Sequence, residues 1–105
     1  MTETEFNETI DELIMGIEDQ LDDIASSIDY ETSSGILTLT MDDGSQIIIN
    51  RQVSHFQLWL AAKSGGFHFE YIDGRWIDTR SKSDFYTILN NCIFQQSGEN
   101  IELSS

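Results

Sequence analysis

The chain has 105 residues, of which 39% are hydrophobic, and this suits one domain over residues 1–105 and excludes a wholly disordered chain. Its formal charge is −14, with 19 acids against five Lys and Arg, so it lacks the basic surface that nucleic acids and anionic membranes require. No apolar run approaches the roughly 20 residues of a membrane span, and no signal peptide opens the chain, so we expect a cytoplasmic protein. The single cysteine, Cys92, fits that compartment and reads as a packing residue.

The first predicted element is a helix over residues 4–24. Its apolar residues recur at steps of three and four, which gathers them on one face: Phe6, Ile10, Leu13, Ile14, Ile17, Leu21 and Ile24. The reverse face is predicted to be anionic: Glu5, Glu8, Asp11, Glu12, Glu18, Asp19, Asp22 and Asp23. Like charges one turn apart cost a few tenths of a kcal/mol per pair, and no Lys or Arg occurs in residues 1–50. A cation or a basic partner would relieve that repulsion.

The middle of the chain alternates between apolar and polar residues, which predicts strands separated by short turns. The turns are marked by Ser33-Ser34-Gly35, Asp42-Asp43-Gly44, Ser64-Gly65-Gly66 and Asp73-Gly74. We therefore expect antiparallel hairpins with strands at about 28–32, 36–41, 46–51, 56–62, 67–71 and 75–78. We assign Asp42 and Asp43 to turn chemistry and not to a site.

A second helix is predicted near the end of the chain. Ser81, followed three residues later by Asp84, is typical of a capped helix start, and Gly98 predicts the stop. The stripe to be buried is Phe85, Ile88, Leu89, Cys92 and Ile93. Ile101 and Leu103 then alternate as an extended tail packed in a groove would.

These elements predict an α+β fold, a two-layer sandwich with both helices on one face of an antiparallel sheet of about six strands. The other sheet face would then meet water. Trp59 shares strand parity with Gln57, opposite to Leu58 and Leu60, so its indole is predicted to stand on that open face. An exposed Trp beside polar groups is typical of a protein interface.

The sequence contains none of the usual catalytic motifs, neither a phosphate-binding Gly-rich loop nor a nucleophile elbow. Paired carboxylates on adjacent helical turns suit hard cations held loosely with most of their water, whereas zinc sites and EF-hand loops need ligands or spacings that are missing here. His55 and His68 have no ligand spacing and are expected to be ordinary surface or strand residues, although His68 lies near Trp59 in the predicted sheet.

Three blocks of the strand region carry a family resemblance. Gly44 to Gln52 (GSQIIINRQ), Gln57 to Ala61 (QLWLA) and Gly65 to Phe69 (GGFHF) resemble the sheet motifs of the frataxin family, most closely its bacterial branch, and the likeness extends over essentially the whole chain. The resemblance implies a helix–sheet–helix fold whose acidic ridge binds iron weakly and contacts the cysteine desulfurase of iron–sulfur cluster assembly. It also implies that the sheet face meets the cluster scaffold protein.

Carried over residue by residue, the resemblance implies iron ligands at Glu18, Asp19, Asp22, Asp23, Asp29 and Glu31. It implies desulfurase contacts at Glu12, Glu18, Asp19, Asp22 and Asp23, and scaffold contacts at Asn50, Gln52, Gln57 and Trp59. Other divalent cations are expected to compete with iron, and the protein is expected to be monomeric without metal. It also implies no enzyme beyond a weak ferroxidase activity as a secondary possibility.

The chain departs from its relatives at two places. The loop Ile24-Ala25-Ser26-Ser27-Ile28 lacks the further aspartates that bacterial relatives often carry, and Asn7 stands where relatives offer a histidine. Two alternatives account for the charge in other ways. An acidic mimic of nucleic acid would bind a basic DNA-binding partner and ignore iron, and a third explanation is adaptation to salt or cold.

Overall fold

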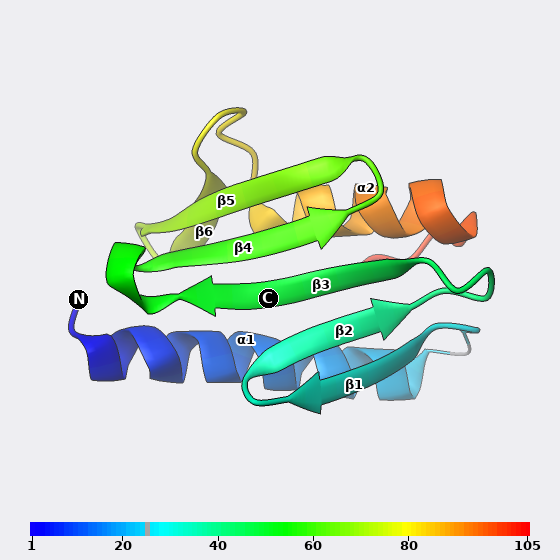
Figure 1. The fold of residues 1–105 in the computed structure, drawn as a ribbon, viewed down its shortest axis with the longest axis horizontal. Helices are drawn as coiled ribbons and strands as arrows, with labels where there is room; N and C mark the ends of the chain where they lie inside the picture. Colours follow the sequence, from blue (N-terminus) through cyan, green and yellow to red (C-terminus); the bar gives the residue numbers. More distant parts are fainter. Residues whose placement is uncertain (25) are drawn as a thin grey trace.

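The computed structural model describes residues 1–24 and 26–105 and shows two helices and six strands (Figure 1). In chain order these are α1 (Glu3–Asp23), β1 (Asp29–Ser33), β2 (Ile36–Thr40), β3 (Gln46–Gln52), β4 (Gln57–Ala62), β5 (Gly65–Ile72), β6 (Arg75–Asp78) and α2 (Phe85–Ser97). A short 3-10 helix, η1 (Val53–His55), joins β3 to β4.

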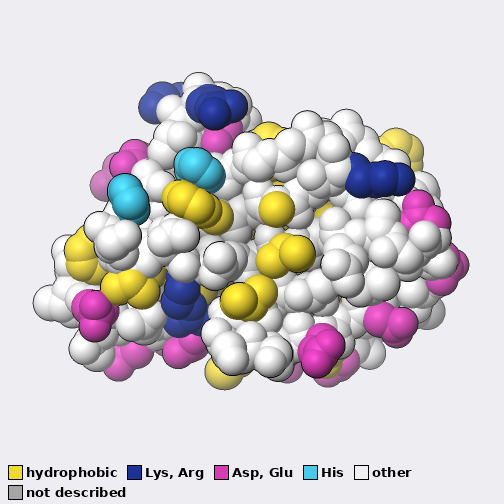
Figure 2. Space-filling model, viewed as in Figure 1, with side chains coloured by type: hydrophobic (Ala, Val, Ile, Leu, Met, Phe, Trp, Pro, Cys, Tyr) yellow, Lys and Arg dark blue, Asp and Glu magenta, His cyan; other side chains and the backbone are white. Residues whose placement is uncertain are grey.

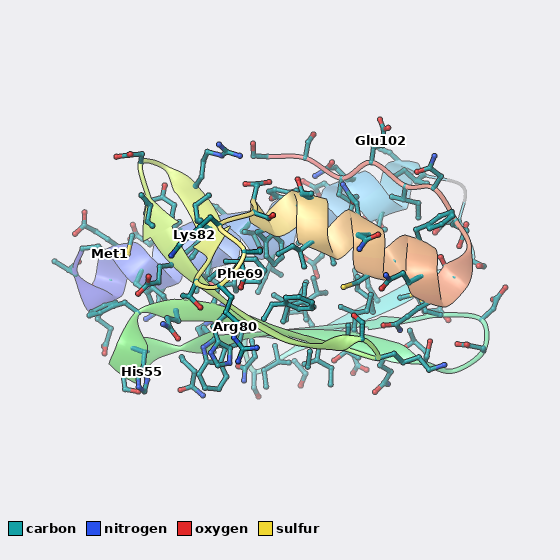
Figure 3. All side chains as sticks on the ribbon, turned by 90° about the horizontal axis from the view of Figure 1, so that it is seen from above. Met1, His55, Phe69, Arg80, Lys82 and Glu102 are labelled. Atoms are coloured by element: carbon teal, nitrogen blue, oxygen red, sulfur yellow. The ribbon has the colours of Figure 1, made fainter. Side chains whose placement is uncertain are left out.

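The sheet is a meander in which every strand pairs antiparallel with its neighbour in sequence, in the order β1 to β6. Both helices cover the same face of this sheet, and the other face is left open (Figures 1 and 3). The α+β two-layer sandwich predicted from the sequence is therefore confirmed.

The core lies between the helices and the covered face of the sheet. Six of the seven apolar residues predicted on the α1 stripe are buried, and Ile24 packs against the core at the helix end. Along β2, β3 and β4 every second residue is buried, which gives the sheet its share of the core: Leu37, Leu39, Ile47, Ile49, Leu58 and Leu60. The two periods read from the sequence thus meet in one apolar layer.

α1 begins with a capping box. The Glu5 backbone N–H donates to Thr2 Oγ1 at 3.1 Å, and the Thr2 backbone N–H donates to Glu5 Oε1 at 2.9 Å. The bond from the Thr2 backbone, followed by that of its side chain, lowers the pKa of Glu5. Glu5 therefore stabilises the helix start, where a negative charge also suits the helix dipole.

The predicted start of α2 at Ser81 is wrong. Asp84 is the N-cap, and its Oδ2 accepts a hydrogen bond from the Tyr86 backbone N–H at 3.1 Å. Ser81 instead donates its hydroxyl and its backbone N–H to Asp78 Oδ2, at 2.6 and 2.9 Å, and so closes the loop after β6. The acid read as the third helical residue is itself the cap, because the loop spends Ser81 on the buried Asp78.

The tail after α2 packs as predicted. Gly98, at φ 75°, ends α2, and Ile101 and Leu103 are buried. The Asn90 side-chain amide exchanges two hydrogen bonds of 3.0 Å with the backbone of Leu103, and the Gln20 amide does the same with Ser104 at 2.8 and 3.0 Å. One amide from each helix therefore holds the tail in extended form. Among the described residues, neither helix is both long and apolar enough to traverse a bilayer.

Candidate metal and partner-binding surfaces

The predicted metal ligands form a strip along one edge of the molecule, which we call the acidic ridge. It consists of Glu18, Asp19, Asp22 and Asp23 in the last turns of α1, and of Asp29 and Glu31 on the edge strand β1. Glu18 is half-buried and the other five are exposed. Two hydrogen bonds between α1 and β1 place the two parts of the ridge side by side, as the next paragraph shows.

Hydroxyl groups of β1 bind two of the ridge carboxylates. Tyr30 Oη donates to Asp22 Oδ1 at 2.7 Å, and Thr32 Oγ1 donates to Glu18 Oε2 at 2.7 Å. The hydrogen bond to Asp22, together with desolvation and the charges of Asp22, Glu18 and Asp19, raises the pKa of Tyr30 to about 12. Tyr30 thus experiences the negative field of the ridge directly, and both hydroxyls fix carboxylate orientation.

Three ion pairs join residues in the described part of the chain, and none involves the ridge. They are Arg51 with Asp11 at 2.7 Å, Arg75 with Asp84 at 3.5 Å and Lys63 with Asp43 at 3.9 Å. The ridge carboxylates therefore lack a cationic partner within residues 1–24 and 26–105. A one-signed field of this kind attracts cations and basic surfaces.

The expectation that no base relieves the acids of α1 is wrong at one position. Arg51, at the end of β3, faces the helices and reaches Asp11 as well as Asn7 Oδ1, the latter at 3.1 Å. Only 16% of the Arg51 side chain is exposed, and Gly35 leaves room for its guanidinium, since a Cβ at Gly35 would lie 3.4 Å from Nη2. Asp11 therefore belongs to a structural contact and not to the free anionic face.

The geometry of the ridge limits how a metal could be held. Across residues 1–24 and 26–105, the acids, histidines and cysteine form no group of three placed to hold a metal ion. A hard cation on the ridge would thus have at most two carboxylates and would keep most of its water. Asn7 already accepts a hydrogen bond from Arg51, and Ala25, in the loop that lacks aspartates, lies outside the described residues.

The open face of the sheet carries a polar and aromatic row. Asn50, Trp59 and His68 stand opposite one another on β3, β4 and β5, and Gln52 pairs with Gln57 in the next row. Trp59 is partly exposed, as its parity predicts, and its Nε1 donates to Gln57 Oε1 at 2.9 Å. Four predicted scaffold residues therefore lie together on one face, which Figure 2 shows with its hydrophobic side chains over the central strands.

His68 is part of this row, although its sequence spacing suggested an ordinary strand residue. Its ring stacks on Trp59 with the centroids 4.1 Å apart and the planes 10° from parallel. The register of the β4–β5 hairpin, counted from the turn at Lys63-Ser64, would have placed it opposite Trp59. Ile48, which is 36% exposed and lies opposite Ala61, extends the row with an apolar surface.

Comparison with known proteins identifies the family. Residues 1–99 match the frataxin-like domain. The chain belongs to the frataxin family. It is 36% identical to frataxin from Psychromonas ingrahamii, of the CyaY protein family, with a TM-score of 0.94 and 100% of both chains covered. It is also 26% identical to the trimeric frataxin of the yeast Saccharomyces cerevisiae complexed with ferrous iron, with a TM-score of 0.71, over 94% of this chain and 88% of that chain.

The frataxin resemblance inferred from the strand motifs, and its bacterial CyaY branch, are thus confirmed. Membership of the frataxin family supports an iron-related role in iron–sulfur cluster assembly, and frataxins are in general iron-binding proteins without enzymatic activity. The ridge and the open face are the two surfaces on which such a role would act.

Proposed function

We propose that this frataxin is an iron-dependent accessory protein that docks on the cysteine desulfurase through the acidic ridge and on the cluster scaffold through the open sheet face. The observation that carries the proposal is the ridge itself, six carboxylates without a cationic partner among the described residues of a chain in the frataxin family. Family membership also favours this function over a nucleic-acid mimic, which would have no use for iron.

Docking on the desulfurase would be electrostatic. Glu12, Glu18, Asp19, Asp22 and Asp23 lie on one helix, and a basic patch on the partner would be attracted by their summed field. Charge complementarity of this kind raises the association rate and makes binding sensitive to salt. It also removes the like-charge repulsion that α1 carries when the protein is alone.

Iron would bind the same ridge weakly, through Glu18, Asp19, Asp22, Asp23, Asp29 and Glu31. A hydrated cation on two carboxylates neutralises part of the field, so iron would modulate desulfurase docking and tune sulfur transfer. Other divalent cations with oxygen preference would compete, because nothing in the carboxylate pairs selects strongly for iron. We propose that the protein is monomeric when the ridge holds no metal.

The scaffold would meet Asn50, Gln52, Gln57 and Trp59. The indole offers a large flat apolar surface, while the amides offer hydrogen bonds around it, which is the composition of an interface hot spot. His68 supports the indole from one side by stacking and so fixes its orientation. The sheet beneath is rigid, so the surface is arranged before the partner arrives.

The test of desulfurase docking is a charge reversal with a matched control. Asp19→Lys, Asp22→Lys and Asp23→Lys together should abolish binding to purified desulfurase in a low-salt pull-down, while the circular dichroism spectrum stays unchanged. The control reverses three exposed acids away from the ridge, Glu8, Asp42 and Glu102, which gives the same net charge. Binding retained by the ridge variant, or lost equally by both variants, would contradict docking through the ridge.

The test of iron binding is a titration with ferrous ion followed by nuclear magnetic resonance. The amide resonances of residues 18–31 should broaden first, and sodium chloride should weaken the effect because the site is exposed. A nucleic-acid mimic would show no such perturbation and would bind DNA-binding proteins instead.

A further inference from the structure

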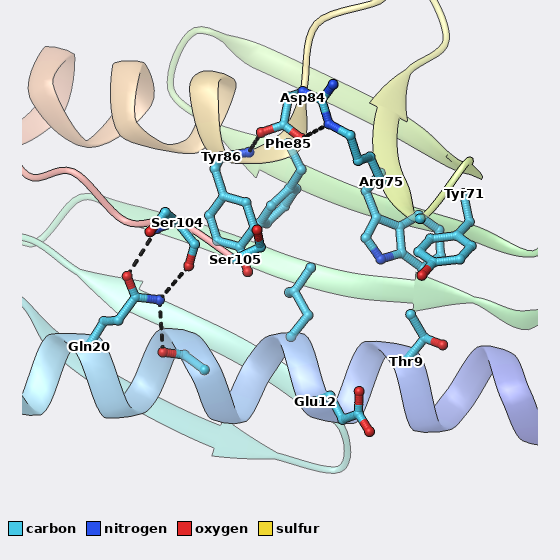
Figure 4. A pocket seen from close by; sticks show the side chains of 14 residues that line it. Thr9, Glu12, Gln20, Tyr71, Arg75, Asp84, Phe85, Tyr86, Ser104 and Ser105 are labelled. Atoms are coloured by element: carbon cyan, nitrogen blue, oxygen red, sulfur yellow. Dashed lines mark hydrogen bonds and ion pairs between the residues drawn. The ribbon is translucent and has the colours of Figure 1, made fainter.

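A groove outside both proposed surfaces lies on the helical side of the molecule, between α1, the β5–β6 turn and the start of α2 (Figure 4). Its volume is about 470 Å³. One wall is a face of α1 formed by Thr9, Glu12, Leu13 and Gly16, and the opposite wall includes Tyr71 and Trp76. The ridge acids Glu18 to Asp23 do not line it.

The groove contains an unmet hydrogen-bond donor. Trp76 is 5% exposed, and its Nε1 is buried without a hydrogen-bond partner among the described residues. Buried donors in folded proteins are almost always paired, since an unpaired one loses its interaction with water without replacement. Trp76 lines the groove, so an acceptor bound there would complete the site.

Gly16 leaves open space in the wall. It lies in the middle of α1, where glycine weakens a helix relative to alanine, and a Cβ placed on it would meet no atom within 4 Å. Packing within the fold therefore gives no reason for the missing side chain. The space beside Gly16 lies in the groove and can receive an apolar side chain of a ligand, next to Leu13.

The adjoining end of the groove already holds an extended chain. Ser104 and Ser105 of the tail line it, and the Gln20 amide that holds the Ser104 backbone also donates to the Gly16 carbonyl at 3.1 Å. The tail shows the binding mode, in which alternate apolar residues are buried and amide side chains pair with the backbone. The stretch between Gly16 and Tyr71 continues that track.

Charge indicates which side chains an occupant would carry. Glu12 stands exposed on the α1 wall and takes part in no ion pair among the described residues, whereas Asp84 on the other wall is paired with Arg75. We propose that this groove binds an extended peptide segment of a partner protein, with a backbone carbonyl on Trp76 Nε1, an apolar side chain over Gly16 and a Lys or Arg facing Glu12. The proposal does not depend on iron or on the ridge.

The test uses the full 15N-labelled chain and the probe peptide acetyl-Lys-Ile-Lys-Leu-Lys-amide at physiological salt. The peptide should shift the Trp76 indole N–H resonance, assigned with a Trp59→Phe variant. A peptide of equal charge, acetyl-Lys-Gly-Lys-Gly-Lys-amide, should leave it in place, because general attraction to an acidic protein lacks the apolar contact. Absence of a shift with the first peptide, or an equal shift with both, would overturn the proposal.

Variants locate the site. Gly16→Leu fills the groove and should weaken peptide binding by about tenfold or more, whereas Met15→Leu, at a neighbouring exposed position outside the groove, should leave it unchanged. Gly16→Ala is the smaller substitution if Leu perturbs the fold, and it should weaken binding while raising the melting temperature. Unchanged affinity in both Gly16 variants would refute the site. Equal binding of a peptide with the tail sequence ENIELSS would refute a basic partner and indicate a second copy of this chain.

Discussion

The repulsion stored at the carboxyl end of α1 can be measured by reversing one charge. Asp23 is the last residue of the helix, where the helix dipole disfavours anions, and the last turn of α1 contains no base. Asp19 lies one turn before it, so the pair also repels. Asp23 is exposed and accepts no hydrogen bond within the described residues, which makes it suitable for a clean substitution.

The expected magnitude of Asp23→Lys follows from these two contributions. Replacing an anion with a cation at a helix C-terminus contributes about 0.6–2 kcal/mol, and changing the Asp19 pair from repulsive to attractive adds about 0.4–1 kcal/mol. We expect the free energy of unfolding to rise by about 1–2 kcal/mol after partial solvent screening, which corresponds to roughly 4–10 °C in melting temperature for a chain of this size.

The matched control is Glu3→Lys, which changes the net charge by the same amount at the other end of α1. Glu3 lies in the first turn, where the dipole favours an anion, so this substitution should lower the free energy of unfolding by about 0.5 kcal/mol or more. Thermal and urea unfolding in low salt, repeated in high salt, measure both variants. If Asp23→Lys does not stabilise, or if both variants shift equally, the local account of the ridge is wrong and only overall charge matters.

Three further substitutions test the remaining parts. Trp59→Ala should lower the free energy of unfolding by about 1 kcal/mol in a urea titration, against about 3–5 kcal/mol for the buried Trp76→Ala, yet should weaken the complex with scaffold protein more than any core change. Asp22→Asn should bring the pKa of Tyr30 from about 12 toward its ordinary value in a 13C resonance titration, because the raised pKa preserves their hydrogen bond until the pH passes the folded-state value. Asp78→Ala should cost about 2 kcal/mol, since it removes the acceptor of two Ser81 hydrogen bonds. Burial opposes ionisation of Asp78, but these bonds prevail and lower its pKa, so its contribution should be present above about pH 4 and disappear below the folded-state pKa.

The order of helices and strands could be predicted because one period governs each segment. The boundaries of α1 shift by one residue from the prediction, and the strand ends by one or two. β5 begins at Gly65, within the predicted turn, because backbone pairing with Ala61 and Ala62 requires no side chain. Phe56 was predicted to begin β4 but adopts φ 50° at the end of η1, which is a choice made by the connection and not by strand periodicity.

The ridge positions on α1 followed from helical spacing alone, whereas contacts across the fold did not. Arg51 is 40 residues from Asp11 in sequence, and no periodicity relates a strand end to a helix turn on the opposite layer. Glu18 and Asp22 were predicted as free ligands, but their hydroxyl partners on β1 became visible only once the edge strand was placed beside the helix.

The strand β1 links the two proposed surfaces. Its residues alternate, so Tyr30 and Thr32 face α1 and hold the ridge carboxylates, whereas Glu31 stands opposite Thr38, which in turn stands opposite Ile48 on the open face. The ridge therefore turns the corner of the sheet through Asp29 and Glu31 and ends one row from Asn50 and Trp59. A desulfurase bound to α1 and a scaffold bound to the sheet would meet at this edge strand. A cation held there would lie between both partners, which gives iron a position from which to influence either contact.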